Sequence, residues 1–432
     1  MTSPSRAHRP STADSARDLL SLTGRVYPPI AFTGRLPFAM MIVGILTFAT
    51  LELDSVALAG LLAACAGVGT AISGPWVGAL ADRTGQRAVL LVAGAVSLLA
   101  TGAFLSVVLL DGPLGALIVA AVAMGASTPQ VAPFSRARLV RLARGLEEHR
   151  RSRATSLVMS YESVMDEVSF VIGPVIVGAF SVVIAPWAPL VVSMALTATA
   201  IMAFALHRTA ALSPVVHDDA LQNQPGRGPL VTRELALLIG AMFLVGGIFG
   251  ATLTALTEFM TLRGEGEFTG IAYGAMSLGA ILTAGALVLA PVSFSLQRRW
   301  TVFGAVASAG ALGLVASDSL LLIVVALFAA GCGVGAVLVA LFSLGAEVAA
   351  PGRTTTVLTI LQSTLVVGQA LVTAGAGALA ASTGPAAAFV VSLVSGALLV
   401  ALALAFGAVR GRPQRVSASA STERPRGGPT RA

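Results

Sequence analysis

Long apolar segments alternate with short polar ones along most of this chain. A helix needs about 20 apolar residues to cross roughly 30 Å of hydrocarbon, because each residue adds about 1.5 Å to its length. The pattern predicts an all-α membrane protein with twelve transmembrane helices, of which the first and the ninth are short. The predicted spans are 37–51, 56–79, 88–110, 114–133, 157–183, 190–206, 235–258, 271–291, 300–315, 320–344, 357–379 and 387–406.

The composition excludes a water-soluble protein. Of the 432 residues 56% are hydrophobic and 11% are charged, whereas soluble domains carry about 25% charged residues. Whole-chain disorder, nucleic-acid binding and a secreted disulfide scaffold are excluded on the same grounds. Cys65 and Cys332 lie in apolar runs with no further ligand spaced to join them, so we expect no metal and no cofactor. There is no phosphate-binding loop and no nucleophile beside a base, which argues against an enzyme.

The placement of arginine predicts the topology. With twelve spans, 26 of the 27 basic residues fall on one side of the membrane, and Arg263 alone falls on the other. Cytoplasmic loops carry the excess of arginine, so both termini are expected in the cytoplasm and the chain in the plasma membrane. On this interpretation the arginines from Arg136 to Arg153 form a basic interfacial helix or loop whose charge serves topology.

The polar segments divide the chain into two similar halves. We expect a flexible cytoplasmic tail at 1–34, a six-helix bundle at 35–206, a cytoplasmic linker at 207–233, a second six-helix bundle at 234–408 and a disordered tail at 409–432. A faint repeat with an offset of 200 residues supports the division, since Glu162 falls on Gln362 and Ser163 on Ser363. Many transporters are built from such repeats.

A motif between the second and third spans adds a family to this picture. Residues 78–87 read GALADRTGQR, which closely resembles the cytoplasmic signature of the major facilitator superfamily. Glycine allows two helices to approach closely and to turn tightly, and an aspartate suits an ion pair or the positive end of a neighbouring helix. The resemblance implies a pseudo-symmetric transporter whose cytoplasmic gate includes Gly78, Asp82, Arg83, Gly85 and Arg87. The corresponding loop of the second half has no aspartate, so the gate would rest mainly on Asp82.

A weaker resemblance lies in the fifth span. Ser160, Ser169, Gly173, Pro174 and Gly178 stand where drug–proton antiporters of this superfamily carry a glycine-rich motif. The match implies efflux, although ordinary packing of small residues is an alternative explanation. The arginine that this branch carries in its fourth span is absent from 121–125.

Three acidic residues lie well inside one apolar span. Glu162 and Asp166 are four residues apart and share a helix face, while Glu167 points about 100° aside. A charge at the centre of a bilayer costs at least about 2.5–3.5 kcal/mol, so these residues should face the bundle interior. We expect no arginine at the same depth to pair with them. The hypothesis is that Asp166, assisted by Glu162, couples transport to protons and that Glu167 is structural; alternatively, all three only lock the helix to its neighbours.

The sequence therefore predicts a class of cargo but no specific substrate. We expect a monomeric secondary transporter that exports a small drug-like or apolar compound in exchange for protons. The alternatives are a proton-coupled uptake permease for a small metabolite and a permease-like sensor that does not transport. Polar residues expected to line a central cavity are Ser127, Thr128, Gln130, Thr252, Thr254, Gln362, Ser363 and Gln369.

Overall fold

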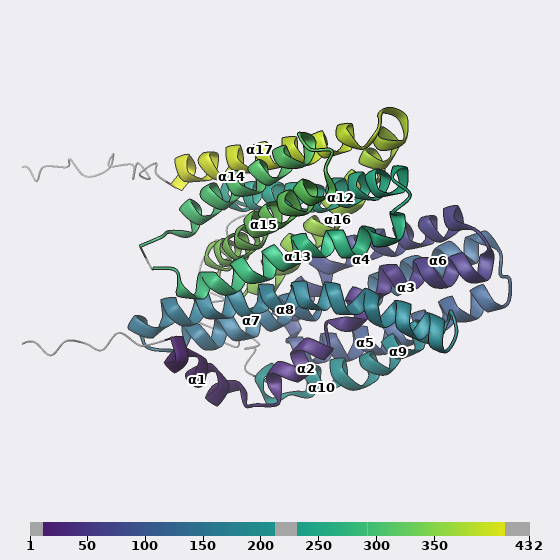
Figure 1. Ribbon diagram of the computed structural model, residues 1–432. Helices are drawn as coiled ribbons and strands as arrows, with labels where there is room; N and C mark the ends of the chain where they lie inside the picture. Colours follow the sequence, from purple (N-terminus) through teal and green to yellow (C-terminus); the bar gives the residue numbers. More distant parts are fainter. Residues whose placement is uncertain (1–11, 212–230, 292, 411–432) are drawn as a thin grey trace, which may run out of the picture.

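The computed structural model describes residues 12–211, 231–291 and 293–410, and nearly all of them are helical (Figure 1). The first half begins with two short helices and continues with long ones. Its helices are α1 (Thr12–Thr23), α2 (Tyr27–Thr33), α3 (Leu36–Leu53), α4 (Val56–Thr84), α5 (Gln86–Leu109), α6 (Leu114–Ser127), α7 (Val131–Arg144), α8 (Glu148–Val183), α9 (Ala188–Leu196), a π-helical segment at Thr197–Ile201 and α10 (Met202–Leu206).

The second half repeats the pattern with six long helices. They are α12 (Arg233–Leu262), α13 (Thr269–Ala286), α14 (Leu296–Val315), α15 (Leu320–Val348), α16 (Thr354–Thr383) and α17 (Pro385–Arg410). Short 3₁₀ segments lie at Arg208–Ala210, Gly266–Phe268 and Leu287–Leu289.

Eleven helical segments of the described chain are long and apolar enough to cross a membrane. The segment that falls short is α14, because Arg298 and Arg299 lie in the first turn of a helix of only 20 residues. It nevertheless packs along α15 and α17 within the second bundle. The predicted fold class, an all-α membrane protein of two six-helix bundles, is confirmed.

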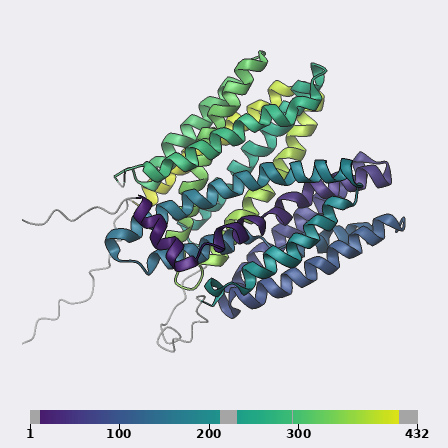
Figure 2. The same cartoon turned by 60° about the horizontal axis from the view of Figure 1, so that its bottom comes forward.

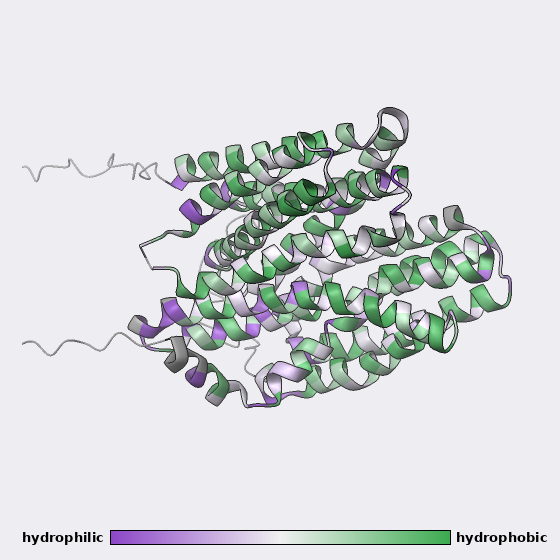
Figure 3. Ribbon diagram, viewed as in Figure 1, coloured by the Kyte–Doolittle hydropathy of each residue, from purple (hydrophilic) through white to green (hydrophobic). Residues whose placement is uncertain are grey.

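The two bundles meet mainly through α4 and α8 of the first bundle. Helix α4 packs against α16, and α8 packs against α13 and α15; α7 also contacts α16. Figure 2 shows the bundles close together near the end where the described chain begins, at Thr12, and stops, at Arg410, and diverging toward the opposite end. We call this end the tail end. In Figure 3 hydrophobic colouring covers most of the helices, while hydrophilic colouring gathers at the tail end and along α7 and α8.

Close approach of α4 and α16 depends on two glycines. A methyl group on Gly74 would collide with Ser363 Oγ, and one on Gly78 would collide with Thr359 Oγ1. The chain then turns sharply into α5 at Gly85, whose φ of +90° is a backbone conformation that glycine adopts readily. The roles predicted for Gly78 and Gly85 in helix approach and in the turn agree with this geometry.

Two boundaries differ from the sequence prediction. Residues 12–33, predicted to be a flexible tail, form α1 and α2, and α2 continues almost directly into α3. The fourth span, predicted to end at Pro133, breaks at Thr128–Gln130 and continues as α7 to Arg144. Pro129 has no amide hydrogen to donate, which explains the break, and Pro133 lies in the first turn of α7, where proline is tolerated. Residues 212–230 of the predicted linker, and the predicted tail from 411 onward, lie outside the described residues.

Candidate functional site

The acidic residues of α8 meet two arginines inside the first bundle. Arg35 pairs with Glu162 and donates from Nε to Asp166 Oδ1 at 3.0 Å. Arg136 donates from Nη2 to the other carboxylate oxygen of Asp166 at 2.5 Å. Except for Asp166, which is 14% exposed, these side chains are at most 3% exposed. We call Arg35, Arg136, Glu162 and Asp166 the four-charge cluster.

The expectation that these acids have no arginine partner is therefore wrong. Arg136 belongs to α7, and it faces the protein interior because the fourth span continues past Pro133 as a helix. Arg138 is equally buried, so the interpretation of this stretch as purely topological charge fails for both residues. Arg35 precedes α3, and its long side chain reaches inward to α8. The prediction that Glu162 and Asp166 share one face is consistent with their common contact with Arg35.

A hydrogen-bonded chain extends the cluster toward the tail end. Ser135 Oγ donates to Glu162 Oε1 at 2.7 Å, and the hydroxyl of Tyr27 lies 2.9 Å from the same serine oxygen. Tyr27 and Ser135 are fully buried. On the other side of the cluster, the guanidinium of Arg136 lies 3.5 Å from the ring centroid of Phe342 in α15. The contacts of the four-charge cluster therefore extend from Tyr27 of α2 to Phe342 of the second bundle.

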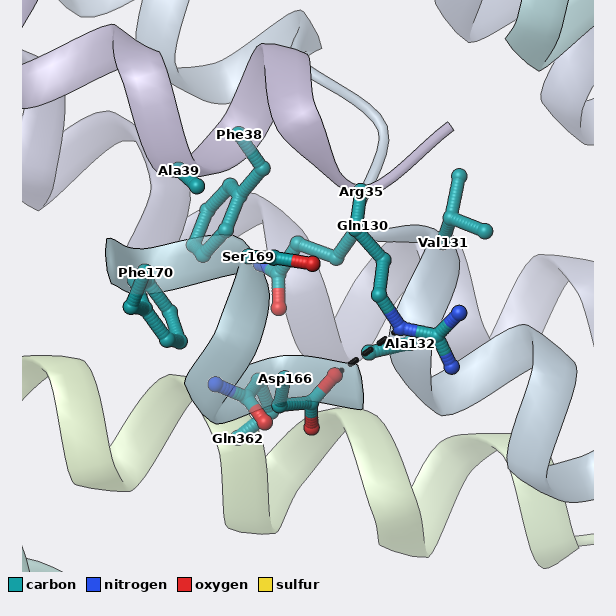
Figure 4. Close-up of a pocket in the computed structure, with 10 residues that line it drawn as sticks. All are labelled: Arg35, Phe38, Ala39, Gln130, Val131, Ala132, Asp166, Ser169, Phe170 and Gln362. Carbon is teal, nitrogen blue, oxygen red and sulfur yellow. Dashed lines mark hydrogen bonds and ion pairs between the residues drawn. The ribbon is translucent and has the colours of Figure 1, made fainter. Parts of the chain in front are cut away.

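Asp166 borders a small cavity between α3, α7, α8 and α16. In Figure 4 the side chain of Gln362, from α16, lies beside Asp166, and the rings of Phe38 and Phe170 stand at the other end of the cavity. These two rings have centroids 6.3 Å apart in an edge-to-face arrangement. Polar groups and aromatic rings therefore face the same space, a combination typical of small-molecule sites.

The break between α6 and α7 supplies another side of this cavity. Gln130 is buried in the break, and its Oε1 has no hydrogen-bond partner among the described residues. Non-helical backbone at membrane depth is tolerated where it lies within the protein or lines a cavity. Gln130 also borders a second small cavity, beside Ser127 and Thr128.

The other cavity candidates are more scattered. Thr252 binds Ser392 of α17 at 2.5 Å inside the second bundle, and Thr254 donates to a carbonyl of its own helix. Ser363 is buried against Gly74, and its hydroxyl has no partner among the described residues. Gln369 lies where α16 crosses Gly246 and Gly250 of α12. Of the eight candidates, four line the two cavities: Ser127, Thr128, Gln130 and Gln362.

Asp82 closes the tail end by capping a helix of the opposite bundle. Its carboxylate accepts hydrogen bonds from the backbone amides of Thr355 and Thr356, at 3.3 and 2.7 Å, and from Thr356 Oγ1 at 2.8 Å. Those amides belong to the first turn of α16, which has no helical partner for them. Arg141 lies close enough to interact electrostatically with Asp82. We call these contacts of Asp82 the latch; Arg83 and Arg87 are exposed beside it.

A second set of contacts joins the bundles at the same end. Arg138 donates to Gln86 Oε1 at 2.7 Å, and Gln86 donates onward to Thr355 Oγ1 at 3.2 Å. Arg138 also binds the carbonyl of Phe204 at 2.7 Å, next to the start of the linker. The pKa of His207 at this point is lowered from its ordinary value, first by burial and then by the positive charges of Arg138 and Arg208.

The small residues predicted in the fifth span occupy different environments. Gly173 packs against Ala39 of α3, where a methyl group would approach Ala39 Cβ to 2.9 Å, whereas Gly178 has open space around it. Pro174 lies inside α8 without ending the helix. Ser169 borders the cavity and donates to the Met165 carbonyl at 2.6 Å, and Ser160 is fully buried. Among the described residues, no group of three potential metal ligands of the His, Cys, Asp and Glu types occurs.

Sequence reasoning missed several residues of this site, namely Tyr27, Arg35, Phe38, Gln86, Ser135, Arg136, Arg138 and Phe170. The strongest signal in the sequence was that Arg136 and Arg138 follow Pro129 and Pro133 closely. A proline is tolerated in the first turn of a helix, so a new helix carrying both arginines could begin there.

Comparison with known proteins agrees with this architecture. The family model described as Major Facilitator Superfamily matches residues 30–373. No curated protein matches the chain significantly.

Three solved transporters share the fold. A structure of the human organic anion transporter MFSD10 (TETRAN) is 18% identical, with a TM-score of 0.65, over 91% of this chain and 100% of that one. A bacterial homologue of the iron transporter ferroportin, in an outward-facing state, is 13% identical, with a TM-score of 0.67, over 91% and 99%. The E. coli fucose:proton symporter FucP is 16% identical, with a TM-score of 0.62, over 88% and 98%. The chain is therefore a member of the major facilitator superfamily and a secondary transporter.

Proposed function

We propose that this transporter exports a small amphipathic or apolar compound from the cytoplasm across the plasma membrane in exchange for protons. The observation that carries the proposal is the cavity at Asp166, which combines two phenylalanine rings with a carboxylate. The rings suit the apolar part of a cargo, and the carboxylate of Asp166 lies on the same helix as Glu162 and Glu167, the other candidates for proton coupling. The glycine and proline pattern of α8 supports the efflux direction.

The cycle follows from the contacts between the bundles. In the present arrangement the latch and the Gln86 contact hold the tail end together. Opening that end requires α4 to leave the first turn of α16 and Arg136 to leave the ring of Phe342. The cavity lies between these contacts and the opposite end, so rocking of the bundles would expose it to one side of the membrane at a time.

The candidates for proton coupling are the three carboxyl groups of α8, Glu162, Asp166 and Glu167. They lie on a helix that faces the second bundle, so their surroundings change when the bundles rock. A proton that binds in one arrangement and leaves in the other would link the gradient to the movement, because a ligand shifts an equilibrium only by its differential affinity for the two states.

The proposal is tested in vesicles that contain the purified full-length protein. A panel of amphipathic dyes, both cationic and neutral, is offered with and without a pH gradient, and proton movement is followed with a pH-sensitive dye inside the vesicle. We expect accumulation of at least one dye against its gradient, together with proton counterflow. Proton movement in the same direction as the dye would establish uptake instead, and no movement of any dye with any gradient would refute the proposal.

A further inference from the structure

Two faces of α8 carry polar side chains. Those on one face are paired with arginines, and those on the other have no charged partner among the residues that the structure describes. Glu162 and Asp166 face the arginines of the first bundle. Ser160, Ser163 and Glu167, spaced by three and four residues, share another face of the helix. Val164 lies on that second face, 4.0 Å from the position a methyl group would take on Gly285 of α13. This second face of α8 is therefore directed at the second bundle.

Glu167 is buried on this face without a compensating charge. Its side chain is 7% exposed and has no ion pair or hydrogen bond to the described residues. Ser160 Oγ and Ser163 Oγ are likewise buried without a hydrogen-bond partner in the described part of the chain. Two buried hydroxyl groups without hydrogen bonds thus lie in a row with Glu167 on this face, although buried polar groups are normally hydrogen-bonded.

The elements packed against α8 bring no cation to Glu167. On α13 the only titratable side chain is Tyr273, which lies close enough to interact electrostatically with Glu167. The Leu287–Leu289 segment and α9 have no titratable side chain, and α15 has only Cys332 and Glu347.

Charged groups also lie on the first-bundle side of α8. The charged residue that acts on Glu167 is the neighbouring Asp166, of like sign. Helix α3 carries Glu52, and the described part of α1 has Arg17 and Asp18; Asp18 pairs with Arg150 near the start of α8. The arginines of α7 are Arg136, Arg138, Arg141 and Arg144. Of these, Arg136 donates to Asp166, which also accepts a hydrogen bond from Arg35.

We propose that Glu167 is the proton-binding group of the transport cycle and that the four-charge cluster stays ionised throughout; this inference rests on the proposed proton-coupled function. Two positive and two negative charges cancel in the cluster, so it has no need of a proton. Glu167 adds one uncompensated negative charge, which is costly to bury unless a cation neutralises it. Binding of one proton converts the carboxylate into a neutral carboxyl group, and its release restores the negative charge.

The two serine hydroxyls mark a direction from which a proton would reach Glu167 once water bridges the gaps between them. Ser163 and Ser160 precede Glu167 on the side of α8 that leads to the tail end, at about 6 and 10 Å along the helix axis. Glu167 itself lies at the contact with α13, where rocking of the bundles changes its access to water. A neutral side chain is compatible with a closed contact at Tyr273, and an ionised one favours a hydrated, opened contact.

Infrared spectroscopy tests the assignment without knowledge of the cargo. pH-difference spectra of the full-length protein in lipid report the carbonyl stretch of a protonated carboxyl group that ionises during the titration. We expect this band in the wild type, in Asp166→Asn, in Glu162→Gln and in the exposed control Glu52→Gln, and its loss in Glu167→Gln. Persistence of the band in Glu167→Gln, or its loss in Asp166→Asn alone, would overturn the assignment. Should Glu167→Gln fail to fold, Glu167→Asp must retain a band with a displaced frequency and midpoint.

Transport by the same variants separates this inference from the proposed function. With a transported dye from the panel above, Glu167→Gln should lose accumulation driven by the pH gradient and retain dye-for-dye exchange without a gradient. Gradient-driven accumulation by Glu167→Gln at the wild-type level would refute the role of Glu167 and leave proton-coupled transport standing. If wild-type vesicles show no coupling at all, the proposed function fails, and the infrared titration still decides whether Glu167 binds the proton.

Discussion

Replacement of Asp82 by alanine is expected to open the tail end of the transporter. The substitution removes three hydrogen bonds to Thr355 and Thr356 and leaves the first amides of α16 without their cap. These contacts exist only while the bundles touch at this end. Their loss therefore destabilises the closed arrangement relative to the open one and leaves the fold of each bundle intact.

The size of the effect follows from helix capping. Removal of a capping side chain costs about 0.5–2 kcal/mol, and loss of a negative charge at a helix N-terminus adds about 0.3–1 kcal/mol. Together these give about 1–3 kcal/mol, which corresponds to a shift of about 5- to 150-fold in the ratio of closed to open molecules. Asp82→Asn keeps an acceptor and loses the charge, so it should fall between the wild type and Asp82→Ala.

Distances between spin labels measure this shift directly. After Cys65 and Cys332 are replaced by alanine, labels are placed at Arg87→Cys and Pro351→Cys, two exposed positions on opposite bundles beside the latch. The variant should show a larger population of long distances than the wild type.

The control for this experiment is Asp111→Asn. Asp111 is exposed in the loop before α6, away from the latch, and has a φ of +51° that asparagine also tolerates. Its distance distribution should match that of the wild type. An unchanged distribution in Asp82→Ala would refute the idea that this cap holds the bundles together.

Three further outcomes are expected. Arg35→Gln leaves Glu162 buried without its partner and should destabilise the protein by about 3–5 kcal/mol, seen as a lower Tm in detergent, whereas the exposed control Arg87→Gln should leave Tm unchanged; equal Tm values would contradict the buried pair. Gly78→Val should lengthen the same label distances by colliding with Thr359, and Thr359→Ala should partly restore them; no effect in the single variant would refute the close approach. The pKa of His207 is lowered in the folded state, so the stability of the wild type should decline as the pH falls below the ordinary histidine pKa of about 6.5. Melting curves at several pH values should show a smaller loss of Tm in acid for His207→Gln than for the wild type. An equal loss of Tm in both proteins would contradict this reasoning.

The sequence was sufficient for the architecture because membrane helices follow from local composition. The run of apolar segments predicted the spans, and the GALADRTGQR motif predicted a glycine-dependent contact with an aspartate at its end. Both features depend on residues close together in the chain. The helix that receives Asp82, α16, lies about 270 residues further along and could not be chosen from sequence alone.

The charge pairing in the site was beyond the sequence for a different reason. Arg35 and Arg136 were assigned to the membrane surface because hydropathy places each of them outside an apolar run. Arg136 reaches the interior because the helix resumes after the break at Pro129, and Arg35 because its side chain spans several ångströms from the start of α3. The pairing of these charges therefore follows from where each arginine side chain reaches and not from the position of its residue relative to the apolar runs.

The cancellation of charge within the four-charge cluster has an electrical consequence. A membrane voltage exerts about 2.3 kcal/mol on each elementary charge per 100 mV, but a neutral group of paired ions that moves as a unit experiences no net force. Arg35, Arg136, Glu162 and Asp166 can therefore be carried along by the rocking first bundle without opposing the field. Voltage then acts on the cycle through the uncompensated charge of Glu167 and through the ions that are exchanged.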